Sequence, residues 1–238
     1  MGYIKELEDK IKDYNTGDYE IIETKTIPSV ENVAFGKKAY KIKLTSFCID
    51  LRKSTDLLKI HDKETCGKIH KSFLTISSKI IIENGGQLRS FNGDCVLAFF
   101  PGQFQSDIEK AIRTAFQLKW ALDVKFSKYF EQFSKLDFGI GIDWGDVLIV
   151  RAGLPKNDNN NDLVFLGMCV NYANAIANQG HNPNHIEISN VIYSNLTENW
   201  IYGMKNGVKT NMWVDGKIKW KEKEFSTKCT SWLQEVKD

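Results

Sequence analysis

Two acidic residues stand where the chain is expected to leave a strand. Asp50 ends the apolar segment 47–49, and Asp94 lies in "SFNGDCV", next to Asn92-Gly93, a strong hairpin signal between two apolar segments. Two carboxylates at one edge of a sheet would suit Mg²⁺ or Mn²⁺, because these ions prefer oxygen ligands and leave room for phosphate oxygens. The sequence therefore predicts a site for divalent cations and phosphate at Asp50 and Asp94.

The residues after Asp50 supply groups that bind an anion. The backbone N–H groups of 51–55 (Leu51 to Thr55) lie at a predicted helix start, where they favour a phosphate. Arg52 would add a bidentate contact, and Ser54 and Thr55 complete the candidate set. A simpler interpretation stays open, in which Asp94 is only a turn residue and Asp50 only flanks the helix, with Ser54 or Thr55 as its N-cap.

The pattern of apolar residues predicts the elements that must position these groups. We expect a strand over 40–50, a helix over 55–83, two strands in "GGQLRSF" and "CVLAFF", and a helix over 106–133. We then expect a hairpin that turns at Trp144-Gly145, a helix over 167–179, the strand "HIEIS", a short helix and a strand-rich tail. The order βαββαβ predicts an α+β fold of the ferredoxin-like type, which brings Asp50 and Asp94 to one sheet edge.

The composition is that of an ordinary globular protein of 238 residues, with 42% hydrophobic residues and a net charge of +2. This balance gives no indication of nucleic-acid binding, and no apolar segment is long enough to span a membrane. Five cysteines without a CxxC motif favour the reducing cytoplasm. We expect an N-terminal extension over 1–40, a catalytic domain over 41–238 and a solvated loop at 157–162, "NDNNND".

The extension contains an amphipathic helix. Its apolar residues are spaced three and four apart, at Ile4, Leu7, Ile11 and Tyr14. Its polar face mixes acids and bases, so we expect the helix to pack on the domain or on a second copy rather than on a membrane.

Three segments resemble the class III nucleotidyl cyclases, from about residue 42 to 180 with a weaker continuation to the end. "CIDLRKST" is similar to the family's first metal motif, an apolar strand followed by Asp and a phosphate loop. "ENGGQLRSFNGDCVLAFF" is similar to its hairpin, and "FGIGIDWGDVLIVRAG" with "FLGMCVNYANAIA" to its Gly-rich hairpin and Gly-x-x-Val-Asn helix. Because the three occur in family order and spacing, the resemblance implies the fold and the activity of this family.

The resemblance implies roles for single residues. Asp50 and Asp94, with Leu51 beside them, would hold two Mg²⁺ or Mn²⁺ ions that activate the ribose 3′-hydroxyl for in-line attack and help to release pyrophosphate. Asn171, in "CVNYA", matches the family Asn that orients the ribose or the transition state. In this family one subunit supplies the metal aspartates and the other the base pocket and the Asn. The resemblance therefore implies a head-to-tail homodimer with two shared sites.

The sequence departs from the purine-specific members at three positions. Ser90 and Val164 stand where adenylate cyclases read adenine, and a valine cannot accept the adenine amino proton. The Glu and Cys that read guanine are missing as well. Ala175 stands where the family has its transition-state Arg. Arg52 is one candidate replacement, and a Lys of "GKIKWKEKE" (216–224) that reaches the triphosphate across the dimer is another. Ser90 and Val164 are the candidate base-binding positions.

Several interpretations of these departures stay open. One is an inactive cyclase-like regulatory module, although both metal aspartates are present, and another is a purine cyclase. A third is suggested by "DLRKST" and the tryptophan-rich end, which are similar to the pyrimidine cyclases of bacterial Pycsar anti-phage systems. That branch implies cyclic UMP or cyclic CMP made from UTP or CTP, with UTP favoured. It also implies a separate effector that the cyclic nucleotide activates after phage infection.

Overall fold

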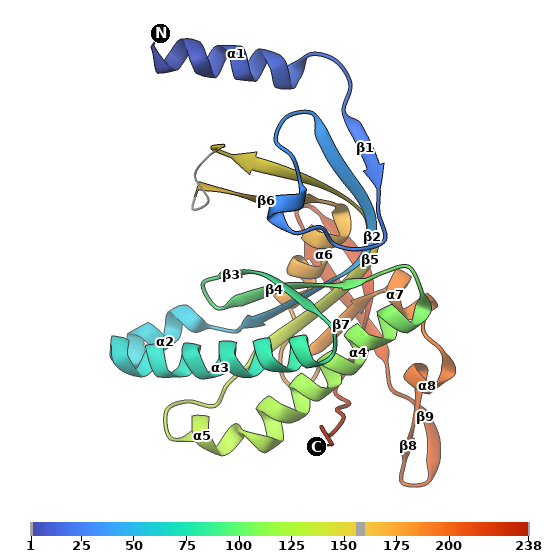
Figure 1. Ribbon diagram of the computed structural model, residues 1–238. Helices are drawn as coiled ribbons and strands as arrows, with labels where there is room; N and C mark the ends of the chain where they lie inside the picture. Colours follow the sequence, from blue (N-terminus) through green and yellow to red (C-terminus); the bar gives the residue numbers. More distant parts are fainter. Residues whose placement is uncertain (1, 156–159, 238) are drawn as a thin grey trace.

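One mixed sheet organises the protein (Figure 1). The structure, a computed structural model, describes residues 2–155 and 160–237. The strand order is β10-β11-β7-β5-β2-β4-β3, with β1 paired to β2 and β6 paired to β5. The strands of this sheet are β1 Glu20–Glu23, β2 Lys38–Leu51, β3 Gln87–Asn92, β4 Cys95–Pro101, β5 Phe138–Gly153, β6 Asn161–Leu166, β7 Ile186–Ser189, β10 Val214–Trp220 and β11 Lys223–Thr230. Its central part, β5-β2-β4-β3, confirms the predicted ferredoxin-like βαββαβ arrangement.

Helices pack on both faces of the sheet, and a small hairpin lies apart from it (Figure 1). The helices are α1 Tyr3–Asn15, α2 Ser54–Ile60, α3 Lys63–Glu83, α4 Gln105–Trp120, α5 Ser127–Glu131, α6 Met168–Ala177, α7 Asn190–Ser194 and α8 Glu198–Ile201. A 3₁₀ turn covers Val30–Asn32 and a π-helical turn Ala121–Lys125. The separate hairpin consists of β8 Tyr202–Lys205 and β9 Val208–Asn211.

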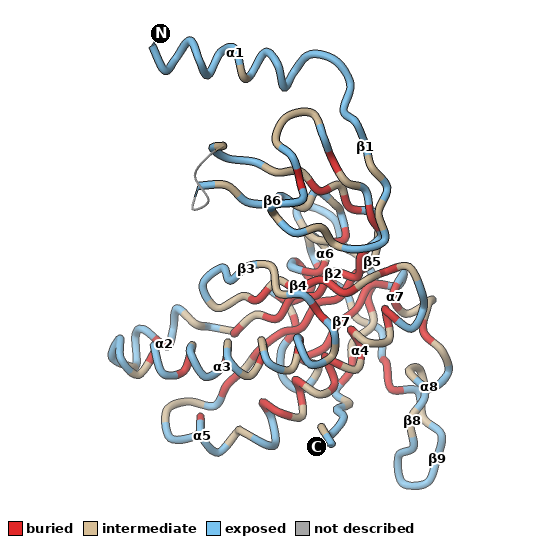
Figure 2. The backbone as a smooth tube through the Cα atoms, in the orientation of Figure 1, coloured by how far each residue is buried: buried red, intermediate tan, exposed pale blue. Residues whose placement is uncertain are grey.

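The alternation of side chains along β2 assigns its residues to the two faces. Phe47 and Ile49 belong to the large core that α3 and α4 complete, whereas Cys48 packs with Ala173 and Ala177 of α6. Successive side chains of a strand point to opposite faces, so Asp50 lies on the same face as Cys48 and α6. Figure 2 shows the buried residues concentrated in the central strands and the adjoining helix faces.

Two helices that the sequence predicts as continuous are interrupted. The predicted helix over 55–83 is α2 and α3, because Asp62 accepts a hydrogen bond from the Thr65 N–H (2.7 Å) and starts a new helix as its N-cap. The predicted helix over 106–133 is α4, the π-helical turn and α5. Apolar periodicity carries across both breaks, so it could not reveal them.

The predicted turn at Trp144-Gly145 is wrong. β5 continues through both residues and pairs with β2 from Phe138 opposite Leu51 to Ile149 opposite Tyr40. The Trp144 side chain donates to the Gly102 carbonyl (2.8 Å), which fixes it at the side of the sheet. The hairpin instead joins β5 to β6, and Asn161 and Asp162 of the predicted loop already belong to β6. Residues 157–159 of that loop lie outside the described residues.

The N-terminal part consists of two different segments. β1 pairs in parallel with β2, and Val33 is fully buried, so residues 20–37 pack against the sheet. α1 buries none of its residues, so it does not pack on its own domain, and the other expected alternative, packing on a second copy, stays a prediction. Whether the extension ends at residue 40 stays a prediction. Across the described part of the chain, no helix is both long and apolar enough to span a membrane.

Candidate active site

The sheet places Asp50 and Asp94 at one edge. β2 and β4 are antiparallel with Ile49 opposite Val96, so the same register continues to Asp50 opposite Cys95 and to Asp94 one residue further. Asp94 lies in the two-residue turn that joins β3 to β4, and the preceding Gly93 has the positive φ (66°) that this tight turn requires. The end of the long strand β2 and the turn of the β3–β4 hairpin thus place the two carboxylates at the same edge of the sheet.

The two carboxylates interact electrostatically. Burial and the neighbouring charge of Asp94 raise the pKa of Asp50 to about 6, and the Arg52 guanidinium opposes this rise. Arg52 Nη1 lies 3.7 Å from Asp50 Oδ2. One oxygen of Asp94, Oδ2, is buried without a hydrogen-bond partner among the described residues. Two acids that repel each other, one with an unsatisfied buried oxygen, form a site whose negative charge Arg52 offsets only in part.

This arrangement fits a divalent cation. Carboxylate oxygens are the ligands that Mg²⁺ and Mn²⁺ prefer, and a cation would satisfy Asp94 Oδ2 and relieve the repulsion. No group of three or more His, Cys, Asp or Glu side chains is arranged to hold a metal within residues 2–155 and 160–237. Further oxygens would therefore have to come from the backbone, from water or from a bound phosphate, which is the usual pattern for Mg²⁺ at nucleotide sites.

The segment after Asp50 turns sharply before α2. Lys53 adopts the left-handed conformation (φ 57°) as the N-cap of α2, so the interpretation of Ser54 or Thr55 as the N-cap is wrong. The Arg52 N–H donates to the Asp137 carbonyl (2.8 Å), so the expectation that it is free for a phosphate is also wrong. The N–H groups of Ser54 and Thr55 belong to the first turn, which has no intrahelical acceptors. The anion-binding segment is thus shorter than predicted.

Two thiols line the inner side of the two aspartates. Cys48 is fully buried and Cys95 half-buried, with their Sγ atoms 2.9 Å apart. The hydrogen bond with Cys95 and, after it, burial hold the pKa of the Cys48 thiol well above its usual range. A thiol that stays protonated is a poor nucleophile, so Cys48 acts as a small buried residue of the core.

Two glycines of "FGIGID" explain how α6 comes so close to the sheet. A Cβ on Gly139 would lie 2.0 Å from the Ala177 carbonyl oxygen, and one on Gly141 would lie 2.0 Å from the Ala173 carbonyl oxygen. Only glycine allows this backbone-to-backbone contact. The pattern Gly-x-Gly therefore sets the position of α6, the helix that carries Asn171.

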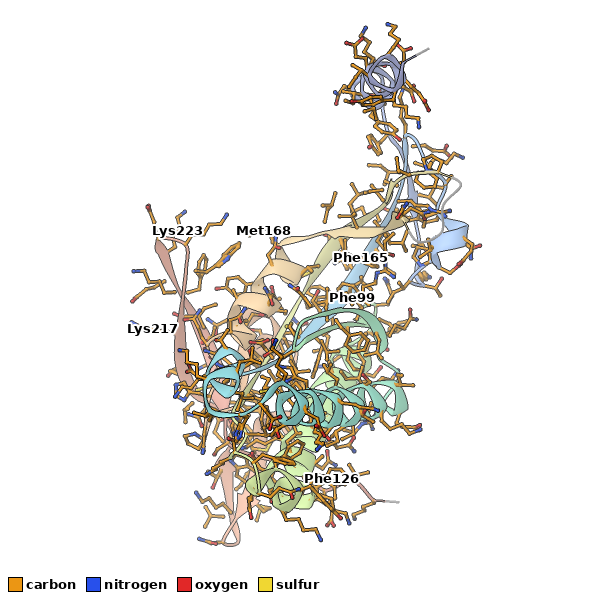
Figure 3. All side chains as sticks on the ribbon, turned by 90° about the vertical axis from the view of Figure 1, so that its left-hand side faces the viewer. Phe99, Phe126, Phe165, Met168, Lys217 and Lys223 are labelled. Carbon is orange, nitrogen blue, oxygen red and sulfur yellow. The ribbon has the colours of Figure 1, made fainter. Side chains whose placement is uncertain are left out.

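Asn171 lies exposed on α6 in a groove of about 500 Å³ that also contains Ala175. The opposite wall is the β10–β11 hairpin, with Lys219, Trp220 and Lys221. Figure 3 shows the side of the molecule that carries α6, with Met168 at its start, and this hairpin, with Lys217 and Lys223. Among the described residues that line the groove, neither metal aspartate is present.

Gln179 fastens this hairpin to α6. Its side-chain N–H donates to the Lys219 carbonyl (3.0 Å), and its side-chain oxygen accepts from the Lys219 N–H (3.0 Å). Tyr172 of α6 also packs edge-on against Trp220 and Phe225, with ring centroids 5.9 and 5.0 Å apart. The fold therefore brings two exposed lysines next to Ala175, where the family has an arginine. The "GKIKWKEKE" segment showed the lysines, but only the tertiary structure shows their position.

The two candidate base-binding positions, Ser90 and Val164, lie on two strands, β3 and β6, that are linked by Arg89. Ser90 is exposed on β3, and Val164 is partly exposed on β6. Arg89 is the extra residue of a bulge in β3, and its guanidinium pairs with Asp162 of β6 and donates to the Leu163 carbonyl (3.3 Å). Burial lowers the pKa of Arg89 from its ordinary value. Arg89 thus links the bulge of β3 to the start of β6 through Asp162 and Leu163.

Arg89 could not be singled out from the sequence. Counting back from Gly93 points to Ser90, and only the bulge changes which side chain faces β6. Arg89 also lies over the ring of Phe165 (5.1 Å), which stacks on Phe99 (4.4 Å between centroids). Figure 3 shows Phe99 and Phe165 close together. Aromatic packing therefore holds this arginine in place.

Comparisons with known proteins agree with this architecture. No protein-family model matches the chain. It is 29% identical over 220 residues to the protein named uridylate cyclase from Burkholderia cepacia, covering 90% of this chain and 91% of that protein. It is 30% identical over 190 residues to the uridylate cyclase of Gulbenkiania mobilis, covering 73% of this chain and 71% of that protein.

Among solved structures, the adenylyl cyclase CyaB from P. aeruginosa has the same fold. The superposition has a TM-score of 0.65 at 24% sequence identity and covers 81% of this chain and 95% of that chain. With the βαββαβ core and the similarity to the two bacterial cyclases over most of their length, the chain belongs to the class III nucleotidyl cyclases, as a relative of the bacterial uridylate cyclases.

Proposed function

We propose that this protein converts a pyrimidine nucleoside triphosphate, UTP in preference to CTP, into its 3′,5′-cyclic monophosphate and pyrophosphate. The product would serve as a second messenger that activates a separate effector in defence against phage. The observation that carries the cyclase activity is the electrostatic coupling of Asp50 and Asp94 at one sheet edge, with Asp94 Oδ2 buried and without a hydrogen-bond partner among the described residues. The names of the relatives support the pyrimidine substrate.

The two aspartates would bind Mg²⁺ or Mn²⁺, two ions per site. When bound, these ions supply the charge that lowers the pKa of the ribose 3′-hydroxyl and stabilises the developing charge on the phosphates. Arg52, which pairs loosely with Asp50 (3.7 Å), is placed to exchange that contact for a phosphate oxygen of the substrate. The N–H groups of Ser54 and Thr55, in the first turn of α2, would hold the triphosphate from the same side.

Asn171 would orient the ribose from the second wall of the site. Because it shares a groove with Lys219 and Lys221, two positive charges are available where Ala175 leaves none. We expect these lysines to stabilise the transition-state charge together with Arg52. As the groove contains neither aspartate, we propose a head-to-tail homodimer in which each site combines Asp50 and Asp94 of one subunit with Asn171 of the other.

Arg89 supports UTP over CTP. A guanidinium only donates hydrogen bonds, and uracil offers a carbonyl where cytosine has an amino group. Ser90, which follows Arg89 in β3, and Val164 of β6 would contribute the other walls of the base pocket. An arginine at this position would therefore accept uracil and leave the cytosine amino group without a partner.

The decisive experiment is an assay of the purified protein with Mn²⁺ and, separately, each of the four common nucleoside triphosphates. We expect a cyclic pyrimidine product, mainly cyclic UMP, and loss of turnover in Asp50→Ala and Asp94→Ala. Asp56→Ala is a matched control, because Asp56 is an exposed acid on α2. A cyclic purine product would show an adenylate or guanylate cyclase instead, and a folded dimer without turnover on any substrate would show an inactive regulatory module.

The shared site has its own test. Asp50→Ala and Asn171→Ala chains are each expected to be inactive as homodimers. Mixing them should restore activity, since one of the two sites in each heterodimer is intact. If mixing restores nothing although heterodimers form, the two groups of residues do not share a site.

A further inference from the structure

α1 carries an apolar stripe that its own chain leaves uncovered. None of its residues is buried, and the side of the helix that carries Tyr3, Ile4, Leu7, Ile11 and Tyr14 has exposed fractions between 38% and 74%. Figures 1 and 3 show the helix standing apart from the sheet in two perpendicular views. A single chain in water would leave this whole stripe in contact with solvent.

The polar face of α1 is organised within the helix itself. Lys5 lies 3.3 Å from Asp9 and Lys10 lies 3.4 Å from Glu6, both one turn apart. At the end of the helix, Asp13 pairs with Lys37 (3.1 Å), just before β2. The two pairs within α1 stabilise the helix, and the Asp13–Lys37 pair attaches its C-terminal end to the residue before β2. None of these contacts involves the apolar stripe.

The types of residue in the stripe point to a two-stranded coiled coil. The spacing 4-7-11-14 places Ile4 and Ile11 at heptad position a, and Leu7 and Tyr14 at position d. Among parallel coiled coils, a β-branched residue at a with Leu at d favours two strands over three or four, and Ile4, Ile11 and Leu7 follow this pattern. We propose that α1 pairs in parallel with the α1 helix of a second copy of this chain.

The charges beside the stripe select the parallel orientation. In this register Glu8 is at position e and Lys10 at position g. Antiparallel pairing would bring Glu8 close to the other Glu8 and Lys10 close to the other Lys10. Parallel pairing places Lys10 near Asn15 and Glu8 near Tyr3, with no like charges in contact. A membrane surface is a poor alternative, because α1 has more acids than bases, with Glu6, Glu8, Asp9 and Asp13 against three lysines.

This inference rests on the homodimer of the proposed function. A helix of 13 residues is too short to dimerise strongly by itself. Once the catalytic domains associate, however, the two helices are held at a high effective concentration, so even a weak pair tightens the dimer. α1 would therefore act as a clasp that holds the two subunits, and both shared sites, together.

A cysteine placed in the stripe tests the parallel pairing. In Leu7→Cys, the two new thiols would face each other across the helix pair, so mild oxidation with glutathione disulfide should link two chains. The matched control is Asp9→Cys, whose side chain lies on the outer face, and the native protein controls for its five cysteines. Efficient cross-linking of Leu7→Cys alone supports the proposal. Equal cross-linking of both variants, or of neither in a dimeric sample, overturns it.

Sedimentation equilibrium measures the contribution to the dimer. Leu7→Asp should weaken dimerisation by about tenfold or more, because two leucines lose their burial in each dimer. Lys12→Asp, on the polar face, should change the dissociation constant of the dimer by no more than about twofold. If Leu7→Asp leaves the dimer unchanged, α1 is not a clasp. That result would not affect the proposed function, which fails instead if the native dimer turns over no nucleotide.

Discussion

The charge of Asp94 acts directly on Asp50. It is one of the two causes, with burial, that raise the pKa of Asp50 to about 6, while Arg52 acts in the opposite direction. Two residues far apart in sequence are thus coupled through one sheet edge. This coupling has consequences for stability and for cation binding that can be measured without any substrate.

The first prediction concerns stability against pH. Because the pKa of Asp50 is higher in the folded chain than its ordinary 3.8, the folded state holds the proton more tightly. The free energy of unfolding should therefore decrease as pH rises from 3.8 to about 6, and the Asp50 contribution should level off above that. Asp50→Asn should remove this dependence and stabilise the metal-free protein at pH 7.5 by about 1–2 kcal/mol.

Chemical denaturation at a series of pH values measures this effect. Asp56→Asn is the control, since Asp56 is exposed and its pKa is lowered by Lys59, so its substitution should give no stabilisation. If the free energy of unfolding of Asp50→Asn changes with pH in the same way as that of the native protein, the electrostatic account is wrong.

The second prediction concerns Mn²⁺. A cation that binds the folded state at about 100 times its Kd adds about 2.7 kcal/mol to stability. We expect this gain for the native protein at pH 7.5 and a smaller one at pH 5, where Asp50 is mostly protonated. Asp94→Ala should lose the gain without loss of metal-free stability, because Asp94 Oδ2 makes no hydrogen bond among the described residues.

Thermal unfolding with and without MnCl₂ provides the measurement. Asp215→Ala, which removes an exposed acid paired with Lys228, should keep the full gain. If Asp94→Ala responds to Mn²⁺ like the native protein, the cation binds elsewhere.

The third prediction concerns the contact between β5 and α6. Gly141→Ala would place a Cβ 2.0 Å from the Ala173 carbonyl oxygen, and backbone on both sides prevents an easy adjustment. We expect a loss of about 3 kcal/mol in the free energy of unfolding, or failure to fold. Gly67→Ala is the opposite case, because Gly67 is an exposed helical residue with open space, and should stabilise by about 0.5–1 kcal/mol. Urea unfolding of both variants compares the two sites. If Gly141→Ala leaves the free energy of unfolding unchanged, the backbone of α6 does not contact that of β5 at this position.

The fourth prediction concerns the lysines beside Ala175. Lys219→Ala and Lys221→Ala should each lower kcat, by about 10- to 100-fold for the one that reaches the phosphates. Replacement of that lysine by arginine should restore most of the rate, which a purely structural role would not predict. Lys223→Ala, on the same hairpin outside the groove, is the control. Equal rates for all three alanine variants would leave Arg52 as the sole cation for the transition state.

The fifth prediction concerns the choice of base. Arg89→Gln replaces a group that only donates by one that both donates and accepts. We expect kcat/KM for UTP to fall by about tenfold or more relative to CTP, within the range for one base contact. Gln87→Ala, exposed on the same strand, should leave the ratio unchanged. An unaltered ratio in Arg89→Gln would mean that other residues read the base.

Local patterns determined much of the fold and the first half of the candidate site. The apolar strand before Asp50, the hairpin before Asp94 and the Gly-x-Gly of β5 are short-range signals, and they place both acids on neighbouring strands. The breaks after α2 and in α4 were missed because apolar spacing does not show where a cap or a π-helical turn interrupts a helix. The turn at Trp144-Gly145 was wrong, since β2 is long enough to pair with both halves of β5.

The second half of the site was decided by the tertiary structure. A bulge in β3 turns Arg89 towards Asp162, and Gln179 ties the β10–β11 hairpin to α6 so that Lys219 and Lys221 face Ala175. No local pattern encodes these neighbours, because they depend on strand register and on contacts between segments far apart in the chain. The sequence by itself determined which residues carry charge and which strands carry the acids. Packing decided which of those charges meet, because the energy of a contact depends on distance and burial rather than on order along the chain.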